Sequence, residues 1–275
     1  MDTAIKNITT NDAKSFFHAH EVGSYQLLDV RQEREYEEGH LPGARLVPLD
    51  QLADRLDEVS ENGPVIVYCR SGNRSMVASS ILLNNGKSDV FNMLGGITAW
   101  NGEKAVGLPT QGMHLGTAAK TPLDILRMAY AMELSLGGYY SRRAKAMDQP
   151  ELIGAFKTLA GLEQTHLDLI LRRIREIAPA ADHEDLQHSP AIILFEGGVD
   201  EDGFETLFGT TMDTPLGALE TALMFEAQAF DLYIRLARDT GDPAAEALFN
   251  SLANEEKKHL KTVGNLLSKH MSNGQ

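Results

Sequence analysis

The single cysteine of the 275-residue chain, Cys69, lies where a thiol would be activated as a nucleophile. It follows the apolar run Val65–Tyr68, which is typical of a buried strand, and a helical pattern begins soon after it. The residues between them are Arg70, Ser71, Gly72, Asn73, Arg74 and Ser75. In a strand–loop–helix turn, backbone N–H groups converge on one point and the helix dipole adds positive potential. The pattern predicts a thiol with a lowered pKa beside an anion site.

A free cysteine at a strand end is also common as a small core residue. Two arginines and several small polar residues follow Cys69, however, and no structural need explains that combination. Gly72 permits the positive φ that such a loop often requires. Arg70 and Arg74 would add positive potential for an anionic donor. The loop therefore favours the functional interpretation.

A second group of residues suited to chemistry occurs in the C-terminal half. It consists of two Glu-x-x-His pairs, each preceded by a glutamate among apolar residues: Glu133, Glu163, His166, Glu226, Glu256 and His259. Residues three apart share a helix face, so each pair can present a carboxylate and an imidazole to one point. An uncompensated buried glutamate is costly, and metal coordination would remove that cost. The combination suits iron or manganese.

The spacing of this group repeats. In both halves, 30 residues separate the first glutamate from the Glu-x-x-His pair, and Tyr140 and Tyr233 each follow the first glutamate by seven residues. A single Glu-x-x-His is usually a solvated helix face, but the repeat indicates one shared centre. The two tyrosines are packing residues or hydrogen-bond partners of that centre, and both interpretations stay open. The remaining C-terminal histidines before the last helix have no such pattern and are expected to be exposed: His114, His183 and His188.

The elements that would position Cys69 alternate between strand and helix. The predicted strands are Gln26–Val30, Arg45–Pro48, Val65–Tyr68 and Val90–Met93. The predicted helices are Asn11–His20, Leu49–Glu58 and Arg74–Asn84. Such alternation predicts an α/β domain over residues 1–108, with a parallel sheet flanked by helices.

The elements that would position the glutamates are long helices. A linker is predicted at 109–120, and an all-α bundle over 121–272 with helices at about 121–147, 150–177, 214–240 and 243–270. Proline stands in the first turn of each. Two helical hairpins joined by a long crossover, 178–213, form a four-helix bundle of ferritin-like connectivity. Its expected core includes Met128, Met132, Leu134, Leu162, Leu169, Phe225, Phe230 and Leu232.

Composition narrows the class of protein. Apolar residues make up 43% of the chain and the formal net charge is −14. This acidity disfavours nucleic acid and anionic membranes as partners. The N-terminal residues do not resemble a secretory signal, no apolar run is long enough to span a membrane, and one cysteine allows no internal disulfide. We therefore expect a cytoplasmic protein.

Four motifs in order resemble the signatures of the single-domain rhodanese family. They are Leu27–Arg31, Glu38–Ala44, Cys69–Ser75 and Leu94–Trp100, and the resemblance covers roughly residues 3–107. It implies a sulfurtransferase in which Cys69 carries a persulfide cradled by the amides of residues 70–75. It also implies mainly structural roles for Asp29, Arg31, His40 and Trp100.

A phosphatase is the alternative on the same fold. That chemistry needs a wider loop, with arginine six positions after the cysteine. Here Arg74 is five positions after Cys69 and Ser75 occupies the sixth. The shorter loop suits a single sulfur atom better than a tetrahedral phosphate.

Residues 120–270 resemble the ferritin-like di-iron superfamily, and rubrerythrin most closely. The resemblance implies two iron ions, with manganese as the alternative, bridged by Glu163 and Glu256. Glu133 and Glu226 would be terminal ligands, and each histidine would bind one metal. Rubrerythrin has a further glutamate where this chain has Ala229, and a four-cysteine module that is missing here. The pattern is nearer to the six-ligand site of bacterioferritin, and electrons would come from an external donor.

These features predict a bifunctional enzyme. The N-terminal domain would pass sulfane sulfur from a small anionic donor to a thiol acceptor, and the bundle would have oxidase or peroxidase activity. One alternative is an iron-binding or storage protein with the N-terminal domain as a sulfur sensor or docking module. Another is a non-catalytic interaction protein, which conflicts with the intact residues of both sites. We expect a homo-oligomer, as a dimer.

Overall fold

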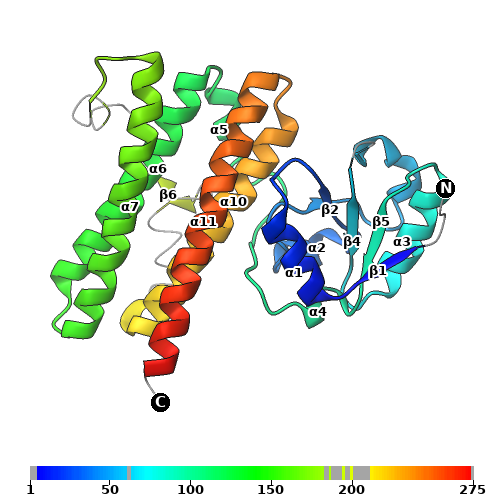
Figure 1. Cartoon of the computed structure of the whole chain (residues 1–275), viewed down its shortest axis with the longest axis horizontal. Helices are drawn as coiled ribbons and strands as arrows, with labels where there is room; N and C mark the ends of the chain where they lie inside the picture. The colour runs from blue at the N-terminus through cyan, green and yellow to red at the C-terminus, as the bar shows by residue number, and fades with distance from the viewer. Residues whose placement is uncertain are drawn as a thin grey trace. The chain divides into compact units, whose positions relative to one another are not determined.

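The computed structural model describes residues 5–60, 63–182, 186, 194–195, 199–200 and 211–273. The chain divides into two compact units, Met1–Thr110 and Gln111–Gln275, and each is described by itself. Figure 1 shows a unit that contains a sheet and a unit built mainly from long helices. The predicted fold class, an α/β sheet domain followed by an all-α bundle, is confirmed.

The N-terminal unit is built on a five-stranded sheet with the order β1-β5-β4-β2-β3. Every neighbouring pair of strands is parallel. The strands are β1 (Lys6–Ile8), β2 (Gln26–Asp29), β3 (Arg45–Leu46), β4 (Val65–Tyr68) and β5 (Val90–Met93). The helices are α1 (Thr10–Ala19), α2 (Glu33–Glu37), α3 (Asn73–Asn84) and α4 (Gly96–Ala99). All four residues of β4 are buried, as expected for the central strand of a parallel sheet covered on both faces.

Some sequence expectations for this unit were wrong. The expected helix Leu49–Glu58 is two short 3-10 helices, η1 (Leu52–Asp54) and η2 (Leu56–Glu58). Leu52 is the only fully buried residue of this segment, so the segment lacks the apolar stripe that would hold a longer helix on the core. Two expected strands end earlier, at Asp29 and Leu46, and the short elements β1 and α2 were not predicted.

The C-terminal unit consists of two helical hairpins. In Figure 1, α6 (Pro122–Ala146) lies beside α7 (Pro150–Ile177), and α10 (Pro215–Asp239) lies beside α11 (Pro243–Asn273). The hydroxyls of Thr121 and Thr214 accept hydrogen bonds from backbone N–H groups in the first turns of α6 and α10, so these residues cap the helices.

The connections differ from the expected picture. The predicted linker contains a short helix, α5 (His114–Ala118). In the predicted crossover, the described residues form η4 (Thr211–Asp213) and a two-stranded antiparallel pair of β6 (Leu194–Phe195) and β7 (Val199–Asp200). His183 and His188, which the sequence analysis expected to be exposed, lie outside the described residues.

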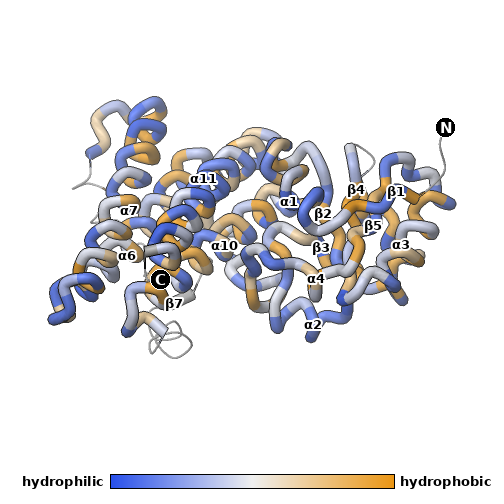
Figure 2. The backbone as a smooth tube through the Cα atoms, turned by 60° about the horizontal axis from the view of Figure 1, so that its bottom comes forward, coloured by the Kyte–Doolittle hydropathy of each residue, from blue (hydrophilic) through white to orange (hydrophobic). Residues whose placement is uncertain are grey.

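The bundle core forms where the helices face one another. Figure 2 shows hydrophobic and hydrophilic residues alternating along α6, α7 and α11, while β4 of the other unit is hydrophobic. The expected core residues Met132, Phe225, Phe230 and Leu232 are buried, whereas Met128, Leu134, Leu162 and Leu169 are half-buried. Within the described ranges, no helix is both long and apolar enough to cross a membrane.

Candidate thiol loop and metal centre

The loop after β4 wraps around the sulfur of Cys69, which is 1% exposed. The backbone N–H of Gly72 donates a hydrogen bond to Cys69 Sγ over 3.1 Å, and the Ser75 hydroxyl lies 3.5 Å from the same sulfur. Gly72 has φ of 101°, in the left-handed region that favours glycine, and α3 begins at the next residue. The structure therefore places the thiol at a helix N-terminus, as the sequence predicted.

Hydrogen bonds act on the protonation of the Cys69 thiol. Burial raises its pKa, but the Ser75 hydroxyl and the N–H groups of Ser75, Ser71 and Gly72 stabilise the thiolate. These hydrogen bonds outweigh burial, so the net pKa of Cys69 is lowered. A larger thiolate fraction at neutral pH makes the sulfur a better nucleophile.

The segment after β5 donates hydrogen bonds to the backbone of this loop. The N–H of Ile97 donates to the carbonyl of Cys69 over 2.9 Å, and that of Thr98 donates to the carbonyl of Arg70 over 3.0 Å. A Cβ atom at Gly96, where φ is 56°, would overlap the backbone of Cys69 and Arg70. The glycine allows this close approach.

The four residues assigned structural roles by resemblance make contacts of that kind. Asp29 and Arg31 form a buried ion pair of 2.6 Å, and Arg31 also donates to the Gly39 carbonyl. The His40 ring stacks on Tyr36 with 3.6 Å between centroids. The indole N–H of Trp100 donates to the carbonyl of Glu103.

The two arginines of the loop differ in their contacts. Arg74 donates two hydrogen bonds of 2.7 Å to the carboxylate of Glu35 in α2. Those hydrogen bonds lower the pKa of Glu35 to about 2. Arg70 is exposed and forms no ion pair with the described residues. The charge of Arg70 is thus open to solvent, whereas that of Arg74 is paired. Glu35 is a residue that the sequence analysis missed.

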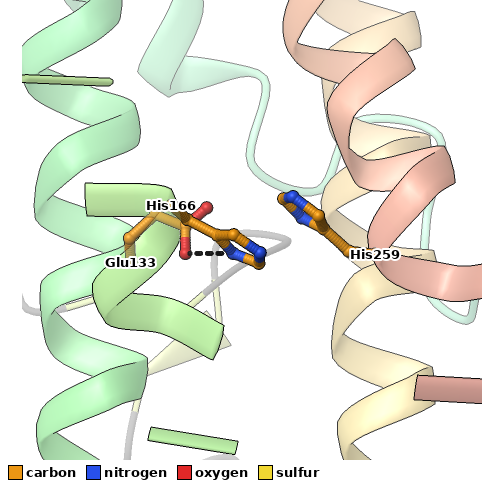
Figure 3. Close-up of side chains that lie close together, drawn as sticks. All are labelled: Glu133, His166 and His259. Carbon is orange, nitrogen blue, oxygen red and sulfur yellow. Dashed lines mark hydrogen bonds and ion pairs between the residues drawn. The ribbon is translucent and has the colours of Figure 1, made fainter. Parts of the chain in front are cut away.

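The bundle brings all six predicted ligands together. Glu133 comes from α6, Glu163 and His166 from α7, Glu226 from α10, and Glu256 and His259 from α11. All four glutamates are at most 2% exposed, and the side chain of His259 is 12% exposed. Figure 3 shows the imidazoles of His166 and His259 pointing toward each other from opposite hairpins, with 3.2 Å between ring centroids.

The contacts within the centre are between imidazole and carboxylate. His166 Nδ1 lies 3.2 Å from Glu133 Oε2 and 3.1 Å from Glu163 Oε2. His259 Nδ1 lies 2.7 Å from Glu256 Oε2 and 3.4 Å from Glu226 Oε2. The ligand atoms of Glu133, His166 and His259 lie within 4.8 Å of one another, and so do those of Glu226, Glu256 and His259. The two halves of the sequence repeat thus bring their candidate ligands to one place.

The electrostatics of this centre fit a metal ion. Burial, and then the neighbouring carboxylates of Glu163 and Glu256, raise the pKa of Glu226 well above its ordinary value, against the effect of His259. Burial likewise raises the pKa of Glu256 to about 7. Glu226 Oε2 is buried and accepts no hydrogen bond from the described residues. Divalent cations would offset this concentration of buried negative charge, so the donor set fits a pair of metal ions.

The two tyrosines of the repeat are buried in the bundle, and one glycine lies beside a candidate ligand. Tyr140 and Tyr233 are buried, and their rings pack near Phe156 and Phe249, respectively. At Gly137, a Cβ atom would lie 3.0 Å from the Cβ of Glu163, so α6 and α7 approach closely beside that ligand. The sequence analysis missed this glycine, although an adjacent Gly-Gly pair inside a helix was a visible signal. Ala229 is fully buried and His114 is exposed.

Comparison with known families agrees with both halves of the molecule. The rubrerythrin family model matches residues 124–267, which is more than half of the chain. The chain belongs to the rubrerythrin family. A rhodanese-like domain model matches residues 11–103, so this rubrerythrin relative also carries a rhodanese-like domain.

Individual relatives match over the length of one domain. The chain is 42% identical over 78 residues to the uncharacterized protein YqhL of Bacillus subtilis, covering 28% of this chain and 62% of YqhL. It is 35% identical over 74 residues to the thiosulfate sulfurtransferase GlpE of Pseudoalteromonas translucida, covering 27% of this chain and 70% of GlpE. A solved rhodanese-like domain protein from Staphylococcus aureus is 33% identical, with a TM-score of 0.33, covering 35% of this chain and 92% of that protein.

Proposed function

We propose that the rhodanese-like domain transfers sulfane sulfur through a persulfide on Cys69. The observation that carries this proposal is the geometry at the sulfur. Cys69 Sγ accepts the N–H of Gly72 at the start of α3, and the hydrogen bonds around it lower the pKa of the thiol. A cradle of donors around one sulfur atom would also stabilise the negative charge of a persulfide. GlpE, a relative that matches this chain over 74 residues, is a thiosulfate sulfurtransferase.

The proposed cycle has two displacements. The Cys69 thiolate attacks the outer sulfur of an anionic donor such as thiosulfate, and the sulfur–sulfur bond of the donor breaks. Sulfite leaves with the bonding electron pair, and the outer sulfur stays on Cys69 as a persulfide. The thiolate of an acceptor then attacks that outer sulfur, and the Cys69 thiolate leaves. The cycle needs no external electrons, and Arg70 supplies exposed positive charge for the donor.

Replacing Cys69 with serine tests this proposal. We expect C69S to form no persulfide with thiosulfate and to transfer no sulfur to a small thiol, while its metal content stays unchanged. The control is Ser79→Ala, a buried position one turn after Ser75 on α3, whose hydroxyl has no hydrogen-bond partner among the described residues. Sulfur transfer by C69S at the wild-type rate would contradict the persulfide assignment.

We propose further that the bundle holds two metal ions through Glu133, Glu163, His166, Glu226, Glu256 and His259. Iron is the metal that we favour, with manganese as the alternative, because carboxylate and imidazole ligands suit both. When bound, such a pair would supply redox chemistry toward oxygen, peroxide or a sulfur species. The surrounding residues hold the ligands in a buried site, and an external protein or small molecule would deliver electrons.

A pair of neighbouring glutamates on α11 gives a matched test of the ligand set. Glu256 is buried in the centre, whereas Glu255 is half-buried and pairs with Lys258 at 3.0 Å and with Arg173 at 3.6 Å. We expect Glu256→Gln to lose bound metal, and Glu255→Gln to retain the wild-type content of about two ions per chain. Equal metal content in both variants would contradict the assignment, and the thiol chemistry of Cys69 would be unaffected by either.

A further inference from the structure

A buried asparagine lies at the end of a hydrogen-bonded chain that reaches the thiol. Asn92 is in β5, between the apolar residues Phe91 and Met93, and is 1% exposed. Its Oδ1 accepts a hydrogen bond from the Ser75 hydroxyl over 2.7 Å, and its Nδ2 donates to Asn7 Oδ1 over 3.0 Å. A buried amide is costly unless it is paired, so these contacts explain how a polar side chain is accommodated in this strand.

The Ser75 hydroxyl has one proton and three acceptors within reach. Asn92 Oδ1 lies at 2.7 Å, the Gly72 carbonyl at 3.1 Å and Cys69 Sγ at 3.5 Å. Because the contact with Asn92 Oδ1 is the shortest, the Ser75 hydroxyl donates its proton to Asn92. In that arrangement the hydroxyl turns a lone pair toward the sulfur and can accept from the thiol, whereas the donation to Cys69 Sγ that lowers its pKa needs the hydroxyl proton turned toward the sulfur.

Rotation of the Asn92 amide reverses this arrangement. An asparagine side chain has a donor and an acceptor of nearly the same shape, and a half-turn exchanges them. With Nδ2 facing Ser75, the amide donates to the hydroxyl oxygen and the hydroxyl proton turns toward Cys69 Sγ. Asn7 is exposed, so its side chain can turn with its partner. Each hydrogen bond in the row from Asn7 through Asn92 and Ser75 to Cys69 then strengthens the next one.

We propose that Asn92 is a positioning residue for Cys69, and that rotation of its amide sets whether the Ser75 hydroxyl accepts from the thiol or donates to the thiolate. This inference extends the proposed sulfur transfer, on which it rests and in which Cys69 alternates between attacking and leaving as a thiolate. Asn92 does not touch the sulfur in the contacts above and acts through Ser75. Its effect is measurable on the thiol alone, without any sulfur donor.

The test uses the fact that Cys69 is the only cysteine, so alkylation of the whole chain by iodoacetamide reports on this thiol. The pH dependence of the alkylation rate gives its pKa. Asn92→Leu removes the Oδ1 that accepts from Ser75 and the Nδ2 that would donate to Ser75 after rotation, so the Gly72 carbonyl is left to compete with the sulfur for the hydroxyl proton. We expect about threefold less thiolate at a pH below the pKa, equivalent to a rise of about half a unit.

The decisive comparison is the same substitution in the Ser75→Ala background. If Asn92 acts through the hydroxyl, Asn92→Leu has no further effect on the alkylation profile once that hydroxyl is gone. An equal shift in both backgrounds, or no shift in either, overturns the proposal. Ser79→Ala is the control, and its profile should match the wild type. The expected shift together with no sulfur transfer by the wild type would count against the proposed function alone, and wild-type sulfur transfer without the shift would count against this inference alone.

A second variant covers the case in which the Asn92→Leu substitution disturbs the sheet. Asn7→Asp changes an exposed residue, and its carboxylate only accepts hydrogen bonds, so it holds Asn92 Nδ2 turned toward it. The Ser75 proton is then kept on Asn92 Oδ1, and we expect a higher pKa for Cys69 that largely disappears with Ser75→Ala. A rise of the same size in the Ser75→Ala background would indicate the charge alone and overturn the proposal.

Discussion

Glu35 in α2 and Arg74 in α3 are joined by two hydrogen bonds of 2.7 Å, which tie the end of the cysteine loop to an element far from it in sequence. Two parallel N–H···O bonds fix both the direction and the distance of the guanidinium. Because both side chains are about one-third exposed, the contact acts mainly as a positional restraint, and solvent screening limits its effect on stability.

The first prediction concerns the pH dependence of this ion pair. The pKa of Glu35 is about 2 in the folded protein, below its ordinary value of 4.5, because Arg74 stabilises the carboxylate. The contribution of the Glu35–Arg74 pair to the stability of the fold is therefore fully present above pH 4.5 and is lost as the pH falls toward 2. We expect the difference in Tm between wild type and Glu35→Gln to shrink over that window. A difference that stays constant between about pH 6 and about pH 3 would argue against the ion pair as its source.

The second prediction concerns the reactivity of Cys69. Because its pKa is lowered, alkylation of Cys69 should reach half of its maximal rate at a lower pH in the folded protein than in the unfolded chain. Removing the Ser75 hydroxyl should move this midpoint upward, because the thiolate loses a hydrogen-bond donor. Rapid-quench alkylation followed by mass spectrometry measures both profiles. A lower midpoint in Ser75→Ala than in wild type would reverse the assigned role of this hydroxyl.

The third prediction uses two adjacent glycines of α6. Alanine at either position raises helix propensity by about 1 kcal/mol, so both substitutions share that effect. At Gly137 the new methyl group would press on the Cβ of Glu163, whereas at Gly138 it would meet only the end of the Arg142 side chain at 3.5 Å. We expect Gly137→Ala to weaken metal binding about tenfold while Gly138→Ala does not. Competition with a chelator measures both affinities, and equal values would exclude a positioning role for Gly137.

The fourth prediction separates metal binding from folding. Glu226 is buried with an oxygen that accepts no hydrogen bond from the described residues, so its carboxylate opposes folding when no metal is bound. We expect Glu226→Gln to stabilise the metal-free protein by about 1 kcal/mol and to lose the stabilisation that metal gives to the wild type. Thermal unfolding with and without added iron under anaerobic conditions tests both. A variant that is less stable without metal would indicate that the carboxylate contributes to folding.

Local signals in the sequence were sufficient to place the long helices and to pick out the residues that converge in the bundle. Thr121 and Thr214 cap helices where the pattern predicted, and the two Glu-x-x-His pairs meet because the same spacing occurs in both hairpins. The short elements were harder to predict, because a strand such as β1 has only three residues and depends on pairing with β5, far along the chain.

Residues that act across the sheet could not be assigned from local pattern. Glu35 precedes Arg74 by 39 residues, and Asn92 follows Ser75 by 17, so tertiary packing alone brings these pairs together. Asn92 was nevertheless visible in the sequence as a polar residue inside an otherwise apolar strand. That signal identifies a residue needing a partner but does not say which one.

The hydrogen bonds from Ile97 and Thr98 to the carbonyls of Cys69 and Arg70 have a consequence for protein engineering. Residues 69–75 are held partly from outside, because the segment after β5 donates hydrogen bonds to two of their carbonyls. Grafting residues 69–75 onto a different scaffold would transfer the chemical groups without their arrangement. A transplantable unit is the loop together with β5, Gly95 and α4, and a domain truncated before α4 would keep its cysteine but lose the hydrogen bonds that support the loop backbone.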